Sequence, residues 1–266
     1  MKIVVCVKQV PEVTNVQVDP VTGTLIREGV QSILNPFCEY ALDHAVRMAK
    51  QLENAHVVAI SMGPPQAKDV LLRCLELGAD EGILVTDRQF AGADTWATSY
   101  TLAQAIRLAV PDYDLILVGK QAIDGDTAQV GPEIAEILSL PQITYGTQIG
   151  LSPSGRQVRV TREVEQGYEV VEAAMPALVS FSKGEMVRRA PSLRDVLQAR
   201  EKPLHKLSAA ALNLPEEELG LKGSFTQVVK VFPPPEKKTG RLLQDLEAEE
   251  AAQAIFDYLI EQRFIE

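Results

Sequence analysis

Residues 114–141, DLILVGKQAIDGDTAQVGPEIAEILSLP, carry the pattern that decides the fold. The stretch opens with four apolar residues at 115–118, and so short a run before a glycine predicts a buried strand. A polar loop follows, with glycines at positions 119, 125 and 131. Apolar residues then recur at helical spacing at 134, 135, 137 and 138. The order of strand, glycine-rich loop and helix is typical of an α/β unit.

The glycine-rich loop also favours a site for phosphate or pyrophosphate. Glycines let backbone N–H groups approach a ligand, and the N-terminus of the following helix adds partial positive charge. The loop matches neither G-x-G-x-x-G nor G-x-x-x-x-G-K-[ST], and an ordinary βα turn is also rich in Gly and Asp, so both interpretations stay open. Asp124 and Asp126 would repel phosphate. We therefore expect their carboxylates to point to ribose hydroxyls, backbone amides or Lys120.

Composition limits the class of protein. The chain has 266 residues, 46% of them hydrophobic, so it can bury a sizeable core. Its net charge of −10 argues against nucleic acid and anionic membranes as main partners. No membrane span, signal peptide or metal site is expected. Cys6, Cys38 and Cys74 lie far apart in apolar runs, which predicts buried, reduced thiols and a cytoplasmic location.

Strand and helix signals alternate along the first 150 residues. Buried strands are predicted at residues 3–7, 56–61, 82–85, 115–118 and 142–145, with amphipathic helices between them. Asn35 before Pro36 predicts an N-cap and a first helical residue, and residues 16–27 carry a hairpin pattern. The alternation predicts an α/β fold with a doubly wound, mostly parallel sheet, which binds ligands at the carboxyl ends of its strands.

The pattern changes after about residue 150. Residues 156–164, 168–171 and 177–181 predict antiparallel strands that extend the sheet, which completes an α/β domain over residues 1–182. Residues 183–243 are expected to form an arm, with a short basic helix after Ser192 and a stiff linker at 233–235. The basic helix predicts either a solvated surface or a docking segment. Residues 244–266 predict an amphipathic helix that packs on a neighbouring subunit.

The assembled motifs resemble the β subunit of electron transfer flavoprotein over essentially the whole chain. The resemblance rests on VCVKQVPEV near the N-terminus, on ILNPFCEYALDHAVR and SMGPPQ, and above all on VGKQAIDGDTAQVGPEIAEILSLP. It implies an adenine-nucleotide-binding α/β fold and a heterodimer with an α subunit that carries FAD. The positions that it implies for nucleotide binding are Cys6, Asn35, Pro36, Phe37, Cys38, Met62, Gly119, Lys120, Gln121, Ala122, Ile123, Asp124, Gly125, Asp126, Thr127, Ala128, Gln129 and Val130.

The family divides by the nucleotide that the β subunit binds. Ordinary members hold AMP with a structural role and carry electrons between dehydrogenases and a quinone-linked oxidoreductase. Electron-bifurcating members hold a second FAD, which receives electrons from NADH and passes them to ferredoxin or flavodoxin and, through the α-subunit FAD, to a dehydrogenase. DGDTAQVGP, PQITY and VDPVTGTLIREGV resemble the bifurcating group, whereas NPFCEYALDHA resembles the AMP group equally well. We expect the bifurcating function and keep AMP as the alternative.

The resemblance also gives the basic segment a role. Residues 186–200 match a loop that anchors the partner dehydrogenase, of acyl-CoA or D-lactate type. Leu193 falls at the apolar anchor position, and Arg188, Arg189 and Arg194 would steer an acidic surface. No catalytic acid, base or nucleophile is expected in such an electron-transfer subunit. A stand-alone nucleotide-binding regulatory protein would need neither the arm nor the terminal helix, and an ATP-using ligase or hydrolase would need more Ser or Lys in the loop.

Overall fold

The computed structural model describes residues 1–12, 32–52, 54–184, 190–230 and 242–265. Its described residues up to Lys230 belong to one compact unit, whereas helix α7, Ala248–Glu261, belongs to a second unit and is considered by itself. The helices of the described residues include none that combines the length and apolar character needed to cross a membrane.

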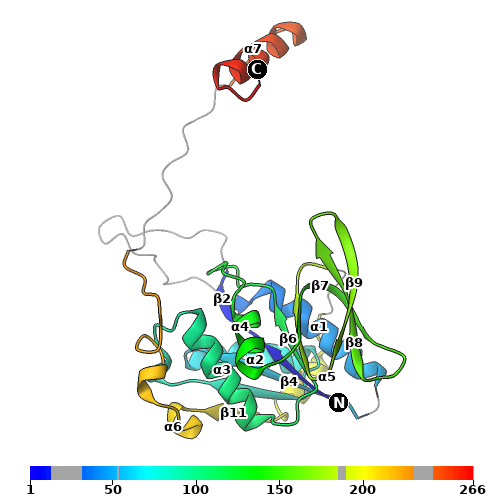
Figure 1. Ribbon diagram of the computed structural model, residues 1–266, viewed down its shortest axis with the longest axis vertical. Coiled ribbons are helices and arrows are strands. Elements are labelled where there is room, and N and C mark those ends of the chain that lie inside the picture. Colours follow the sequence, from blue (N-terminus) through cyan, green and yellow to red (C-terminus); the bar gives the residue numbers. More distant parts are fainter. Residues whose placement is uncertain (13–31, 53, 185–189, 231–241, 266) are drawn as a thin grey trace. The chain divides into compact units, whose positions relative to one another are not determined.

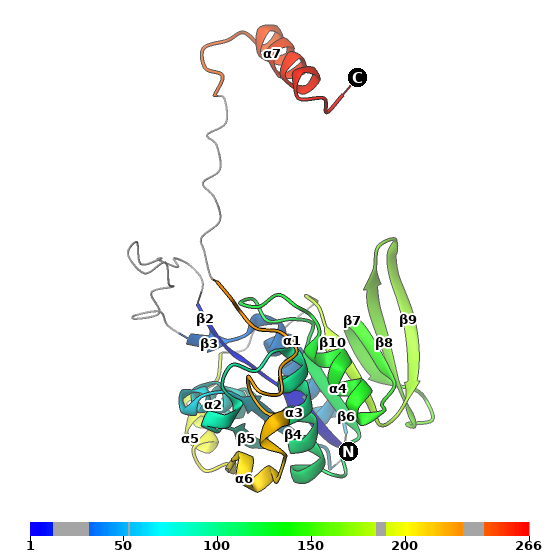
Figure 2. The same ribbon diagram turned by 60° about the vertical axis from the view of Figure 1, so that its left-hand side comes forward.

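The compact unit is built on a sheet in the order β11-β5-β4-β1-β6-β10-β7-β8-β9 (Figures 1 and 2). All neighbouring pairs from β11 to β7 are parallel, and β7, β8 and β9 pair antiparallel. The strands are β1 Lys2–Cys6, β4 His56–Met62, β5 Glu81–Val85, β6 Leu115–Gly119, β7 Gln142–Leu151, β8 Gln157–Val164, β9 Gly167–Ala174, β10 Ala177–Phe181 and β11 Leu204–Leu207. The predicted α/β class, with a mostly parallel sheet and added antiparallel strands, is confirmed.

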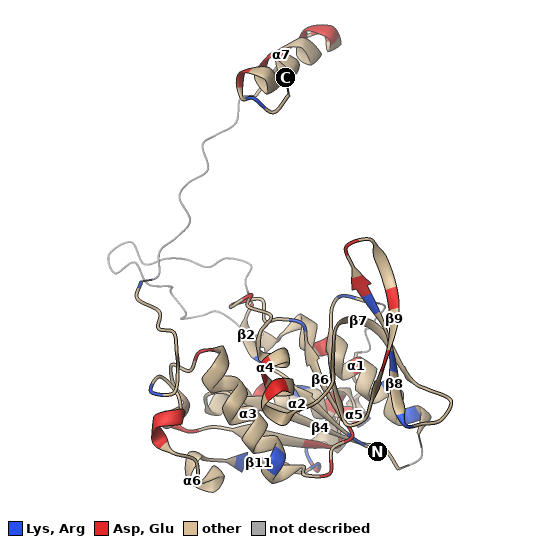
Figure 3. Cartoon of the chain, viewed as in Figure 1, with Lys and Arg blue, Asp and Glu red and all other residues tan. Residues whose placement is uncertain are grey.

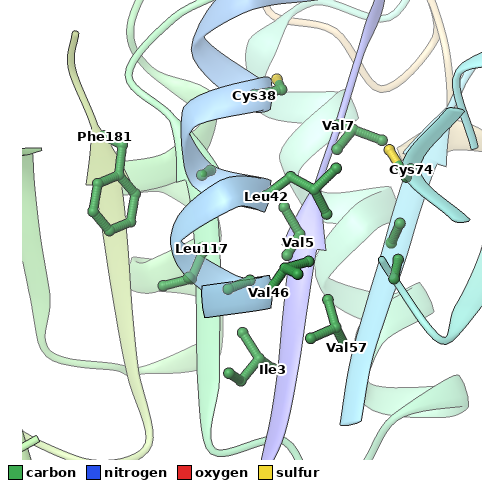
Figure 4. Close-up of a cluster of buried hydrophobic side chains, with 14 of the residues drawn as sticks. Ile3, Val5, Val7, Cys38, Leu42, Val46, Val57, Cys74, Leu117 and Phe181 are labelled. Carbon is green, nitrogen blue, oxygen red and sulfur yellow. The ribbon is translucent and has the colours of Figure 1, made fainter. Parts of the chain in front are cut away.

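Helices cover both faces of the sheet and bury two apolar layers. Alternation along β1 sends Ile3 and Val5 to the layer beneath α1 and α2, and Val4 and Cys6 to the layer beneath α3 and α4. Figure 4 shows the first layer, with Leu42 and Val46 of α1 packed against β1. The helices are α1 Pro36–Gln51, α2 Lys68–Leu77, α3 Thr95–Ala109, α4 Val130–Leu138, α5 Leu193–Ala199 and α6 Ala209–Leu212.

Several helix boundaries follow the local signals in the sequence. Gly78 ends α2 with a φ of 122°, a conformation that only glycine adopts at little cost. Asp94 caps α3 by accepting a hydrogen bond from the N–H of Ala97 at 3.0 Å. Pro36 occupies the first turn of α1, as its missing N–H allows.

Two predicted features of the chain's second half need correction. Residues 177–181 were expected to form an antiparallel extension, but β10 is parallel and lies between β6 and β7. All five of its residues are buried, which is the burial pattern of an interior parallel strand rather than of a half-exposed one. Within the expected arm, β11 pairs in parallel with β5 at the sheet edge, and α5 packs on α2.

The N-terminal region differs from its prediction as well. β2, Gln9–Pro11, and β3, Ser32–Leu34, pair as a separate antiparallel two-stranded sheet, which the sequence did not predict. The expected hairpin at residues 16–27 lies outside the described residues. The small sheet joins the end of β1 to the start of α1, and it therefore fixes where Asn35 stands.

Candidate nucleotide-binding site

Three neighbouring strands bring the predicted site residues to one rim of the sheet. β4, β1 and β6 are adjacent and parallel, so Met62, Cys6 and Gly119 mark their carboxyl ends. Cys6 lies in register with Ile60 on one side and with Val118 on the other. The first turn of α1 and the loop after β6 meet at the same rim. This rim is where parallel α/β sheets bind ligands.

Asn35 organises the loop from inside the protein. Its side chain is fully buried, and its Oδ1 accepts from the N–H of Ile123 at 3.2 Å. Its Nδ2 donates to the carbonyl of Gln121 at 2.9 Å and to Cys38 Sγ at 3.1 Å. Asn35 stands at the predicted N-cap position, but its side chain makes no capping hydrogen bond. The amide holds a loop nearly ninety residues further along the chain instead.

Gly119 sets the distance between β6 and α1. A Cβ at this position would lie 2.7 Å from both the carbonyl carbon of Phe37 and the amide nitrogen of Cys38. Both are backbone atoms, so they could not move aside without displacing the helix. Gly131 is restricted in a similar way by Val118, whose Cγ2 would lie 2.8 Å from an added Cβ. These two glycines serve close packing, which is one of the functions that glycines have in nucleotide-binding units.

The middle of the loop is open and has a special backbone. A Cβ on Gly125 would meet no heavy atom within 4 Å. Asp126 and Ala128 have φ values of 54° and 55°, a left-handed conformation that costs a non-glycine residue roughly 1 kcal/mol or more. Across the described part of the chain, the backbone N–H groups of residues 127–131 have no protein acceptor. Unpaired donors beside a helix N-terminus fit the oxygens of a phosphate or pyrophosphate.

The two acidic side chains of the loop have hydrogen-bond partners, and its lysine lies over two aromatic rings. Asp124 accepts from Lys8 Nζ at 2.7 and 2.9 Å, and Asp126 accepts from the side-chain amide of Gln121. The predicted partner Lys120 instead lies over the rings of Phe37 and Tyr145, at 5.1 and 5.6 Å from their centroids. Pairing with Lys8 offsets the negative charge that Asp124 would otherwise direct at an anion.

Lys8 and Tyr145 were not predicted as site residues. Lys8 follows a buried strand within the VCVKQVPEV motif, and that position was the available signal for it. Tyr145 has a φ of 60° and lies 40% exposed in β7, and no local pattern indicates it. Their contacts are to residues far away in sequence, so short-range periodicity could not find them.

The two cysteines at the rim, Cys6 and Cys38, are buried and uncharged. Burial, with a smaller contribution from Cys38, raises the pKa of Cys6 to about 12. Burial also raises the pKa of Cys38, although the hydrogen bond from Asn35 opposes that shift. A thiol is a nucleophile only as the thiolate, so neither group acts as one at neutral pH. Within the described residues no group of His, Cys, Asp and Glu side chains is placed to hold a metal ion.

The predicted partner-binding segment is partly described. α5 begins with a capping box in which Ser192 and Asp195 bond each other's backbone. Leu193, its first residue, has 76% of its surface exposed, and Leu197 has 53%. Arg188 and Arg189 lie outside the described residues, and Arg194 is exposed on α5. An exposed leucine at the tip of a well-capped helix is available for contact with another protein.

Helix α7, taken by itself, carries exposed apolar side chains. Ile255, Phe256 and Ile260 have 53%, 49% and 44% of their surface exposed. The first turn is acidic, with Glu249 and Glu250 (Figure 3). None of its residues is buried, and an amphipathic helix of this kind usually packs its apolar side against another surface.

Comparisons with known proteins identify the family of this chain. Residues 22–212 match the electron transfer flavoprotein domain family. The chain is 45% identical to electron transfer flavoprotein subunit beta of Megasphaera elsdenii, over 98% of this chain and 97% of the relative. It is 43% identical to the caffeyl-CoA reductase–Etf complex subunit CarD of Acetobacterium woodii over the full length of both chains, and 42% identical to protein FixA of Azotobacter vinelandii over 92% and 88%. This chain therefore belongs to the electron transfer flavoprotein family, as a β subunit.

Proposed function

We propose that this chain is the FAD-binding β subunit of an electron-bifurcating electron transfer flavoprotein. In this proposal electrons from NADH pass to ferredoxin or flavodoxin and, through the FAD of an α subunit, to a partner dehydrogenase. The single observation that carries the proposal is the open loop at Gly125, followed by five unpaired backbone N–H groups at residues 127–131. A row of that length suits the two linked phosphates of FAD better than the one phosphate of AMP.

Different residues of the rim would bind different parts of FAD. The N–H groups of residues 127–131 would bind the pyrophosphate, and the open space at Gly125 would let it approach the backbone. Asn35 would keep residues 121–123 in place, as it does through its bonds to Gln121 and Ile123. Cys6 and Met62, at the ends of β1 and β4, would form the apolar wall of the pocket.

The chemistry belongs to the cofactor. Bound FAD would supply the capacity to accept a hydride and to release electrons singly. The chain would contribute a mostly neutral environment for the bound cofactor. The Cys6 thiol stays protonated, and Asp124 is paired with Lys8. Lys120 is the cation of the loop itself, and its position over Phe37 and Tyr145 keeps its charge near the rim.

Partner proteins follow from the two exposed apolar surfaces. The relatives are named as subunits, which favours a heterodimer over a stand-alone regulatory protein. We assign α7 to contact with the α subunit and residues 186–200 to docking of the dehydrogenase, with Leu193 as the anchor. Two relatives are named for caffeyl-CoA reductase and acryloyl-CoA reductase, which favours an acyl-CoA-type partner over a D-lactate-type one. The proposed location is the cytoplasm.

The second candidate is the ordinary carrier with structural AMP. Its specific support is the start of α1, NPFCEYALDHA, which places Phe37 and Cys38 against Gly119 and suits the AMP-binding group as well. In that case the N–H groups near Gly125 would face solvent or a single phosphate.

Substitution at Gly125 tests the proposal. Gly125→Asp should lose the β flavin and reduction by NADH, because a carboxylate there would lower affinity for pyrophosphate at least about tenfold. The α flavin should be retained. Gly125→Asn is the matched control: asparagine has nearly the same size as aspartate without the charge, and an added Cβ at position 125 meets no heavy atom within 4 Å. Equal flavin content and NADH reduction in the wild type, the Asp variant and the Asn variant would contradict this assignment of the loop.

A further inference from the structure

Two consecutive residues at the start of α3 join the proposed nucleotide loop to the segment that leads towards α7. Asp94 bonds residues 224–226, and Thr95 bonds residues 129 and 133 at the start of α4. We propose that nucleotide binding at residues 119–131 and anchoring of residues 219–230 are coupled through Asp94 and Thr95. This inference rests on the proposed function for its ligand, but the link itself is made by residues of this chain.

Asp94 fastens the chain just before residues 231–241 begin. Its Oδ2 accepts from the N–H of Thr226 at 2.9 Å and from the Thr226 hydroxyl at 3.1 Å. Its own N–H donates to Ser224 Oγ at 2.8 Å. The same carboxylate caps α3 through Ala97, so the anchor and the helix start share one side chain.

Packing around the anchor is tight. The N–H of Leu221 donates to the carbonyl of Ala91 at 3.0 Å, and Phe225 lies against Trp96 with ring centroids 5.8 Å apart. A Cβ on Gly220 would lie 2.1 Å from the carbonyl oxygen of Gln89, so only glycine fits there. Residues 219–230 thus contact the start of α3 and the loop before it at several positions. A shift of that loop would therefore displace several of these residues together.

Thr95 reaches the other way, to the first turn of α4. Its hydroxyl lies 3.1 Å from Glu133 Oε1 and 3.3 Å from Gln129 Oε1. A hydroxyl has one proton to donate, so these two acceptors compete for it. Ser99, which is fully buried, lies 2.8 Å from the other oxygen of Glu133 and 3.3 Å from the carbonyl of Val130, and the shorter contact assigns its proton to Glu133. Glu133 is therefore fixed to α3, while Gln129 can gain or lose the Thr95 proton.

Binding of an anion changes that competition. Gln129 and Val130 carry two of the unpaired N–H groups, so a phosphate on them would fix the backbone of Gln129. A fixed backbone at Gln129 favours one of the two hydrogen bonds of the Thr95 hydroxyl. Thr95 is the first residue of α3 and directly follows Asp94, the N-cap. The expected effect is firmer anchoring of Thr226 when nucleotide is bound. Because coupling is reciprocal, loosening Thr226 should weaken nucleotide binding by the same factor.

Hydrogen–deuterium exchange on the full αβ heterodimer tests the coupling. Exchange is followed in the peptide of residues 219–230, in protein stripped of nucleotide and in protein reloaded with FAD or with AMP. We expect bound nucleotide to slow exchange there about threefold or more in the wild type. Thr95→Val should abolish this difference. Thr98→Val is the matched control: it is the same change in the same helix, at a hydroxyl with no hydrogen bond within the described residues, and it should keep the difference.

Two results would overturn the coupling: a nucleotide effect that persists in Thr95→Val, or none in a wild type shown to bind nucleotide. A comparison of the variants without nucleotide tests the coupling independently of the proposed function. In stripped protein, Thr95→Val should raise exchange of residues 219–230 at least about twofold over Thr98→Val, and Thr226→Val should raise exchange in residues 120–130. If no nucleotide binds, the proposed function fails and this comparison alone decides the coupling. Unchanged exchange in both variants refutes it.

Discussion

The side-chain amide of Asn35 donates a hydrogen bond to the carbonyl oxygen of Gln121 at 2.9 Å. It joins the start of α1 to the loop after β6, and the same side chain accepts from the N–H of Ile123. Because these bonds are internal to the protein, the loop is held in shape without a ligand. A preorganised loop binds its ligand without first losing conformational entropy, so we expect the proposed nucleotide site to depend on Asn35 even without a contact between Asn35 and the nucleotide.

Asn35→Ala should therefore reduce both stability and nucleotide content. The substitution leaves the Ile123 N–H and the Gln121 carbonyl without their partner, at an expected cost of about 2–3 kcal/mol in the free energy of unfolding. Urea denaturation measures the stability change, and the released nucleotide is measured after denaturation. Gln51→Ala, at the exposed end of the same helix, is the control. A loss no larger than that of the control would show that the two bonds contribute little.

Leu193→Ala should weaken binding of the partner dehydrogenase. Removal of an exposed leucine that becomes a buried anchor costs about 1–3 kcal/mol of binding. Flavin content should not change, because α5 packs on α2 and makes none of the contacts that hold the loop. The measurement is the dependence of electron transfer on partner concentration. Val170→Ala, at an exposed residue of β9, is the control, and equal behaviour of the two variants would make α5 an ordinary surface helix.

Stability should fall between neutral pH and pH 5 because of His44. The imidazole stacks on Phe181 with centroids 4.4 Å apart, and burial, assisted by Arg47, lowers its pKa to about 4. As the pH falls below about 6.5, the unfolded chain takes up this proton and the folded chain does not, so the unfolded state is favoured. The loss should be about 2 kcal/mol by pH 5 and should end near the folded pKa.

His44→Gln tests this pH dependence. Glutamine does not titrate, so the variant should lose less stability than the wild type between pH 7 and pH 5, by about 2 kcal/mol in urea unfolding. Parallel stability profiles for the two proteins would show that His44 is protonated in the folded state at pH 5.

Local sequence patterns predicted most strands, because a parallel strand needs a short run of buried residues, and that run is visible in the chain. They misplaced β10, since Ala177–Phe181 follows two antiparallel strands and nothing local says which neighbours it pairs with. The apolar sequence of Ala177–Phe181 did indicate that this strand is buried. Residues 204–207, LHKL, have no such run, and β11 exists because the exposed edge of β5 offers it hydrogen bonds.

The residues of the candidate site could be predicted to lie together where glycine spacing or a long motif marked them, and their binding of a nucleotide stays a prediction. The structure brings Asn35, Phe37 and Cys38 together with residues 119–123. The role of the Asn35 side chain, the pairing of Lys8 with Asp124 and the position of Lys120 were not predictable. Each depends on residues brought together only by folding. The choice of FAD or AMP as the bound nucleotide stays a prediction.

Nucleotide extraction tests the central claim most directly. The chain is purified with its α subunit, the heterodimer is denatured, and the released nucleotides are separated and quantified against protein. We predict two FAD per heterodimer and no AMP, because the open loop at Gly125 and the unpaired N–H groups after it fit a pyrophosphate. One FAD and one AMP per heterodimer would contradict the bifurcating assignment and establish the ordinary carrier instead.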